Sequence, residues 1–151
     1  MKKTLLCSFV FASVCLGCSQ SKQAEHSTSE TEKSIKVVDP QLQLWVGQYR
    51  GITPCVTCPT FCDGCEGSTI DLKLNQDQSF ELVRTANSGN KKSETFNGKF
   101  AFNDDGKLQI QLHGVKERNL IVWGQNYVEV IDPNSGRPFD AFEDFQLEKL
   151  S

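Results

Sequence analysis

The residues best suited to chemistry are four cysteines in one short segment. Cys55, Cys58, Cys62 and Cys65 follow the pattern C-x2-C-x3-C-x2-C. Thiolates are soft ligands that prefer Cu(I) or Zn(II) to harder ions. Zinc ribbons separate their two Cys-x-x-Cys pairs by far more than three residues, whereas Cu(I) accepts two or three ligands. All four cysteines are therefore candidate metal ligands, and copper, as Cu(I), is the candidate cofactor.

The same four cysteines allow two other interpretations. In an oxidising compartment they could form structural disulfides, in any of three pairings. Bonds within each Cys-x-x-Cys pair would close very short rings, so they would stabilise the whole domain little. Thiol–disulfide exchange would need a helix start that lowers the pKa of a thiol, and no βαβ pattern surrounds the segment. Metal binding and structural disulfides both stay open at this point.

The N-terminus has the pattern of an export signal. Met1-Lys2-Lys3 is a short positive start, and the apolar run that follows, 4–17, is too short to span a bilayer as a helix. It ends in Gly17-Cys18, which resembles the lipobox of bacterial lipoproteins, so Cys18 is the expected site of lipidation. Ser19 is not the aspartate that marks inner-membrane retention, which favours the outer membrane.

The chain therefore divides into three parts. Residues 1–17 are the expected lipoprotein signal peptide, 18–41 a flexible tether, and 42–151 a folded domain. The tether is polar and carries no aromatic residue up to Lys36, a composition that cannot form a core. We expect a cell-envelope protein held to a membrane, its first partner, by an N-terminal lipid.

From residue 42 onwards the sequence indicates short strands. Apolar residues alternate with polar ones between turns rich in Gly, Asn and Asp, which is typical of an all-β barrel or sandwich. Asp105-Gly106 is a strong hairpin signal, because glycine accepts positive φ. No convincing amphipathic helix is present, although 140–148 could form one helical turn. Trp45, Tyr49 and Trp123 are expected in the core. The strand-forming runs are 44–51, 69–74, 79–84, 95–102, 108–112, 119–123, 127–131 and 142–150.

These runs predict an all-β fold, a small antiparallel meander that closes into a barrel of about eight strands. Lys and Arg are scattered and the net charge is -3, so nucleic acid is not expected as a partner. We find no Ser-His-Asp order, phosphate loop or HExxH motif, and expect no enzyme activity. His26 and His113 are expected to be exposed and not to bind metal.

Three stretches resemble the N-terminal domain of the NlpE family of copper-resistance lipoproteins. They are 47–58, which contains Pro54-Cys55 and Cys58, then 96–100, and 127–138. The resemblance spans about 45–150. It implies a lipocalin-like β-barrel, a role in copper homeostasis, and envelope-stress or surface sensing with an envelope sensor protein as partner. The family has one Cys-x-x-Cys, so the loop here is lengthened and carries an additional pair. Cys55 and Cys58 match the family's upstream register, and Cys62 and Cys65 match its downstream register, so either pair can correspond to the family motif.

A second function is compatible with the same sequence. The barrel could be a non-catalytic binding or interaction module in which the loop cysteines form structural disulfides. An interior too tightly packed to admit a ligand would count against the ligand-binding version of this alternative.

Overall fold

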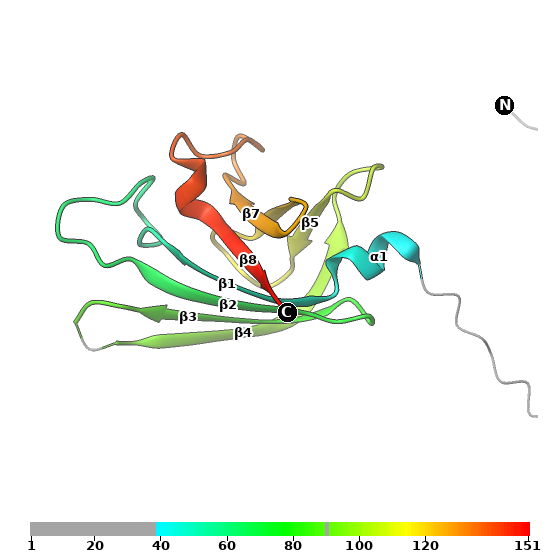
Figure 1. Cartoon of the computed structure of the whole chain (residues 1–151), viewed down its shortest axis with the longest axis horizontal. Coiled ribbons are helices and arrows are strands. Elements are labelled where there is room, and N and C mark those ends of the chain that lie inside the picture. The colour runs from blue at the N-terminus through cyan, green and yellow to red at the C-terminus, as the bar shows by residue number, and fades with distance from the viewer. Residues whose placement is uncertain (1–38, 90) are drawn as a thin grey trace, which may run out of the picture. The chain divides into compact units, whose positions relative to one another are not determined.

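The computed structural model describes residues 39–89 and 91–151, and within them eight strands form a closed antiparallel barrel (Figure 1). The expected signal peptide, Cys18, His26 and most of the tether lie outside the described residues. The strands are β1 Gly47–Thr53, β2 Ser68–Leu74, β3 Ser79–Ala86, β4 Ser93–Phe102, β5 Gln109–Leu112, β6 Leu120–Trp123, β7 Tyr127–Ile131 and β8 Gln146–Leu150.

Each strand pairs with the next one along the chain, and β1 also pairs with β8. Thr53 lies opposite Ser68 in the first hairpin, and Gln48 lies opposite Leu150 where the barrel closes. Closure leaves no exposed sheet edge, which explains how short strands form a stable domain. The prediction of an eight-stranded antiparallel barrel is confirmed.

The core consists of the inward-facing residues of this alternation. Ile70, Leu72 and Leu74 of β2 are buried, whereas Lys73 between them is exposed. This is the period-2 pattern of a strand with one apolar face. Trp45 and Tyr49 are each 1% exposed, and Trp123 packs against the core, so the expected aromatic core is confirmed.

The start of the domain differs from the expectation. Residues Pro40–Trp45 form a short helix, α1, where the sequence pattern predicted the end of the tether and the first strand. Asp39 caps the helix by accepting a hydrogen bond from the Gln41 N–H, and Pro40 occupies the first turn, as is common at helix starts. Trp45 sits near Phe102 and Trp123, so α1 belongs to the folded domain.

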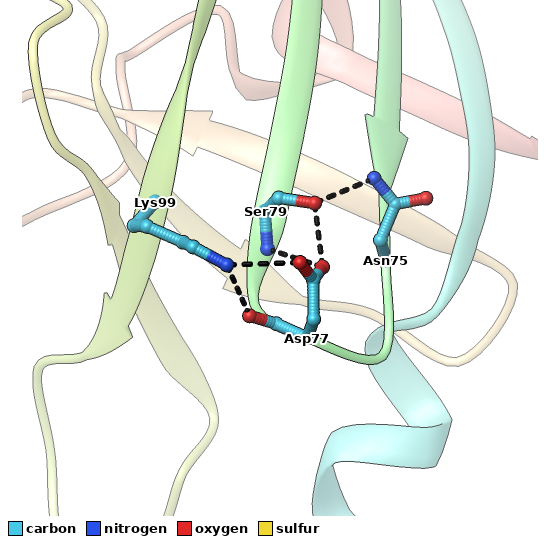
Figure 2. Close-up of polar contacts among 4 residues, drawn as sticks. All are labelled: Asn75, Asp77, Ser79 and Lys99. Atoms are coloured by element: carbon cyan, nitrogen blue, oxygen red, sulfur yellow. Dashed lines mark hydrogen bonds and ion pairs between the residues drawn. The ribbon is translucent and has the colours of Figure 1, made fainter.

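The turn between β2 and β3 is held by a polar network (Figure 2). Asp77 accepts hydrogen bonds from the Ser79 N–H at 3.0 Å and from the Ser79 hydroxyl at 2.5 Å. Lys99 of β4 reaches the same carboxylate at 2.9 Å, and Asn75 donates to the Ser79 hydroxyl. The Ser79 and Lys99 hydrogen bonds lower the pKa of Asp77. The network ties the β2–β3 turn to β4 and has a structural role.

The expected Asp-Gly hairpin signal is only partly correct. A turn does connect β4 to β5, but the positive φ falls on Lys107, at 55°, rather than on Gly106. The Lys107 carbonyl accepts a hydrogen bond from Trp45 Nε1 at 2.9 Å, and its amine pairs with Asp39. These tertiary contacts hold Lys107 in its left-handed conformation. The expected helical turn near the C-terminus is present as the 3-10 helix η1, Phe142–Phe145.

Candidate functional site: the cysteine loop

The four cysteines lie on the loop between β1 and β2, here called the cysteine loop, residues 54–67. It leaves the barrel at the end opposite α1 (Figure 1). Its neck is narrow because Gly67 approaches Thr53 closely. A Cβ on Gly67 would overlap the Thr53 carbonyl oxygen and lie 2.5 Å from the Phe61 ring, and Gly67 also has a φ of 68°. Only glycine fits this position without strain.

One buried arginine holds the first half of the cysteine loop to the barrel. The Arg118 guanidinium donates hydrogen bonds to the carbonyl of Pro54 at 2.5 Å and to those of Cys55 and Cys58 at 2.6 Å each. It also lies 3.4 Å from the Thr53 hydroxyl. A guanidinium presents five donors in a planar fork, so a single side chain can bind several carbonyls. Arg118 therefore clamps both ends of the first Cys-x-x-Cys turn.

Beyond these hydrogen-bond acceptors, Arg118 packs against an aromatic ring. Its side chain lies over the Phe145 ring, 4.8 Å from the centroid, and is only 8% exposed as a residue. Burial lowers the pKa of Arg118, but a guanidinium stays charged at neutral pH. Sequence reasoning missed this residue, because Lys116-Glu117-Arg118 has the composition of an exposed loop. No local signal shows that the third of these charged residues turns inward.

A second anchor holds the other half of the cysteine loop. The Asn87 side chain donates to the Glu66 carbonyl at 3.0 Å, and the Asn87 N–H donates to the Gly67 carbonyl at 3.1 Å. Thr69 in turn donates to the Asn87 side-chain oxygen at 2.8 Å. The two sides of the loop neck are therefore fixed from different parts of the barrel wall.

Each Cys-x-x-Cys forms a tight turn, and the two turns meet through their sulfurs. The Cys58 N–H donates to the Cys55 carbonyl at 2.7 Å, and the Cys65 N–H donates to the Cys62 carbonyl at 2.9 Å. The Sγ atoms of Cys55 and Cys65 lie 2.9 Å apart. The four thiols are unbridged, with Cys62 exposed and the other three partly exposed.

The thiols differ in acidity. A hydrogen bond from Cys55, followed by one from the Gly67 N–H, lowers the pKa of Cys65 to about 7. The same interaction raises the pKa of Cys55, and the interaction with Cys65 raises the pKa of Cys62. Within the Cys55–Cys65 pair, Cys65 is thus the thiol that ionises more readily, and the thiolate is the form that binds metals and attacks disulfides.

In this arrangement the sulfurs of Cys55 and Cys65 are too close to share a metal ion. Two thiolates on a tetrahedral zinc, with Zn–S bonds of about 2.3 Å, lie roughly 3.8 Å apart, whereas Cys55 and Cys65 are at 2.9 Å. Among residues 39–89 and 91–151 no group of three or more His, Cys, Asp or Glu side chains is arranged as a metal site. The assignment of Cys55, Cys58, Cys62 and Cys65 as metal ligands stays a prediction, and it requires the loop to open slightly.

The barrel interior below the loop is nearly full. A cavity of about 10 Å³ lies beneath the loop, lined by apolar side chains together with Arg84 and Arg118. That volume admits about one water molecule. Arg84 is occupied by the Glu117 carbonyl, to which it donates at 2.5 Å, and by the Phe96 ring, 5.2 Å away. The interior offers no calyx for a small apolar ligand.

Two open grooves flank the cysteine loop on the outside. One, of about 600 Å³, runs between Pro59-Thr60 and residues 135–141. The other, of about 420 Å³, lies between Val56–Pro59 and residues 116–118 and 132–134. His113 is exposed, as expected, and lies outside both grooves. The surface between the cysteine loop and residues 132–139 is therefore recessed.

The fold and the site define a small up-and-down β-barrel domain. Its interior is packed, and its candidate reactive groups, the four thiols, lie on a loop at one end of the barrel. The sequence profile of the NlpE N-terminal domain matches residues 49–138, and the chain belongs to this family. A crystal structure of a Shewanella oneidensis protein assigned as a lipoprotein is similar, with a TM-score of 0.57 and 26% identity. The match covers 73% of this chain and 94% of that one.

No curated protein matched the chain in sequence. In the part of the chain that the structure describes, no helix has the length and apolar character needed to cross a membrane.

Proposed function

We propose that this protein is a non-catalytic, lipid-anchored lipoprotein of the cell envelope that takes part in copper homeostasis or envelope-stress sensing through its cysteine loop. Membership of the NlpE family and the similarity to a protein assigned as a lipoprotein support the envelope lipoprotein. The Gly17-Cys18 sequence supports lipidation at Cys18, and the residue that follows it favours the outer membrane.

One observation carries the sensing role: four unbridged thiols are gathered on one loop whose backbone is held to the barrel by Arg118. Because the interior has room for about one water, an external signal must be read on the surface. Soft Cu(I) is the ion that two or three thiolates bind well. Cys65, whose pKa is lowered to about 7 by its hydrogen bonds, offers a thiolate to such an ion near neutral pH.

A Cu(I) titration of the reduced protein against a competing chelator tests this role. We expect the wild-type chain to withdraw Cu(I) from the chelator with a fixed stoichiometry. A variant with all four loop cysteines replaced by serine should lose that capacity, while His113→Ala should retain it. Equal competition by wild type and the serine variant would remove the copper role.

A second candidate function, protein recognition, is favoured by the two grooves beside the cysteine loop. The two grooves share Pro59, Asp132 and Phe139 in their linings, so they adjoin each other beside the loop. A partner such as an envelope sensor protein could bind in these grooves and contact the cysteine loop. Crosslinking in intact cells from a photoreactive residue at Asn134 would test it, with the same residue at Gln76 as a control at the opposite end of β2. Equal crosslinking from both positions would argue against recognition at the grooves.

A further inference from the structure

We infer that Cys55 and Cys65 form a disulfide across the neck of the cysteine loop when the protein meets a disulfide oxidant, leaving Cys58 and Cys62 as the thiols at the loop tip. The inference deepens the proposed function and rests on it for its biological meaning, since the same sulfurs would bind the metal. The pairing itself is tested without metal.

The first argument is the position of the two cysteines in the hairpin. Thr53 and Ser68 form the residue pair at the loop end of the β1–β2 hairpin. Cys55 lies just after Thr53 in the chain and Cys65 just before Ser68, so the two cysteines lie on the two sides of the loop neck. Their Sγ atoms are already 2.9 Å apart. A disulfide bond is about 2.05 Å long, so bond formation needs an approach of only about 0.9 Å.

The second argument is that separate anchors hold the two sides of the neck. Arg118 binds the carbonyls of Cys55 and Cys58, and Asn87 binds the backbone of Glu66 and Gly67 beside Cys65. Neither anchor involves a sulfur atom. The barrel therefore holds the two cysteines together in the reduced protein and leaves both thiols available.

The third argument disfavours the local pair Cys55–Cys58. In each Cys-x-x-Cys turn the backbone forms a hydrogen bond from the second cysteine to the first, and Arg118 fixes the first turn further. The Cys55 thiol is directed to Cys65 rather than to Cys58. A bond from Cys55 to Cys58 would require Cys55 to leave its present partner, whereas the cross-neck bond keeps both turns intact.

The chemistry is a two-step exchange. The Cys65 thiolate attacks a disulfide such as oxidised glutathione, forms a mixed disulfide and releases one glutathione thiolate. Cys55, after losing its proton to water, attacks Cys65 Sγ and releases the second glutathione. Two thiols are oxidised and one glutathione disulfide is reduced to two thiols. Cys65 is suited to the first step, because its thiol is partly exposed and its Sγ lies 2.9 Å from that of Cys55, the second attacking thiol.

The consequence concerns metal binding. Reduced protein offers four loop sulfurs, whereas protein with the neck disulfide offers Cys58 and Cys62 only. The oxidation state of Cys55 and Cys65 would therefore determine how many thiolates are available to bind a soft metal ion.

Disulfide mapping tests the pairing. The tryptic fragment between Arg50 and Lys73 contains all four cysteines, and chymotryptic cleavage after Phe61 separates the two Cys-x-x-Cys pairs. The full chain is equilibrated with oxidised glutathione, quenched in acid, alkylated and digested. We expect the two halves to stay joined, with fragmentation placing the bond between Cys55 and Cys65. Two peptides that separate without reduction, or a disulfide between any other pair of cysteines, would overturn the inference.

Two matched variants give an independent measurement. Cys58→Ser/Cys62→Ser keeps only the neck pair in the loop, and Cys62→Ser/Cys65→Ser keeps only Cys55 and Cys58. In glutathione redox titrations we expect the equilibrium constant for oxidation of the Cys55–Cys65 pair to be on the order of tenfold higher than that of the Cys55–Cys58 pair. Equal constants, or a higher one for the local pair, would contradict the inference. Neither result depends on copper, so a failure here is distinguishable from a failure of the copper titration.

Discussion

Replacing Arg118 with methionine should loosen the cysteine loop and destabilise the barrel by about 2–3 kcal/mol. The estimate starts from the three short hydrogen bonds to the carbonyls of Pro54, Cys55 and Cys58. Each hydrogen bond from a charged group contributes about 1.5 kcal/mol, or roughly 4.5 kcal/mol together. Part of this is offset because the variant no longer buries a charge, and because water can reach the freed carbonyls at the rim.

Chemical unfolding under reducing conditions, followed by tryptophan fluorescence, measures this difference without any disulfide contribution. For a domain of this size, a loss of about 2–3 kcal/mol corresponds to a fall of roughly 8–12 °C in Tm. Arg118→Lys should be intermediate, because an amine cannot donate to the three carbonyls in the geometry of a planar fork. Arg137→Met is the matched control, since Arg137 is exposed on a neighbouring turn.

Hydrogen exchange locates the effect in the molecule. The Cys58 amide, which is hydrogen-bonded to Cys55 in the turn that Arg118 holds, should exchange faster in Arg118→Met, while amides at the centre of β2 should respond only to the global loss of stability. A stability loss below about 1 kcal/mol together with unchanged exchange in the loop would refute the clamp.

Three further predictions test the loop neck, a turn and a buried phenol. Gly67→Ala should lower the free energy of unfolding by about 3 kcal/mol, because Gly67 combines a positive φ with close packing. Gly64→Ala, at a positive φ in open space, should lower it by only about 1 kcal/mol. Equal losses in chemical unfolding would contradict the close approach at Gly67. Gln78→Gly should stabilise by about 0.5 kcal/mol, since glycine relieves the φ of 60° at that turn, and a Tm below that of the wild type would argue against this reasoning. Burial raises the pKa of Tyr49 to about 12, so in a Tyr127→Phe background tyrosinate absorbance should appear near that pH. Because the unfolded phenol ionises near pH 10, the stability of the domain should hold up to about pH 10 and then decline. A tyrosinate step at pH 10 would show that Tyr49 is exposed.

The sequence alone predicted most of the strands. The alternation in β2 places Ile70, Leu72 and Leu74 on one face, and the structure buries all three. It also predicted that Trp45 is in the core, but not that Trp45 ends a helix. A helix of six residues is too short to show a reliable period, and this one is held by its packing and by the Asp39 cap rather than by its own propensity.

The candidate site was predictable only in part. The spacing of the cysteines showed that they share one loop, but four cysteines can pair in three ways, and no spacing argument selects one. The structure brings Cys55 to Cys65, ten residues apart, because both sit at the neck of a hairpin whose register is set by β1 and β2. The positive φ at Lys107 was equally hidden, since its cause is contact with Trp45 and Asp39.

The sequence by itself determined the number and order of the strands, the inward side chains and the gathering of four thiols on one loop, because all of these follow from local spacing. Only the tertiary structure decided the register in which β1 pairs with β8, the small size of the interior cavity, and the binding of Arg118 to the carbonyl of Cys55 from 63 residues further along the chain. Contacts of that range depend on how the sheet curves and closes, and residue spacing carries no information about them.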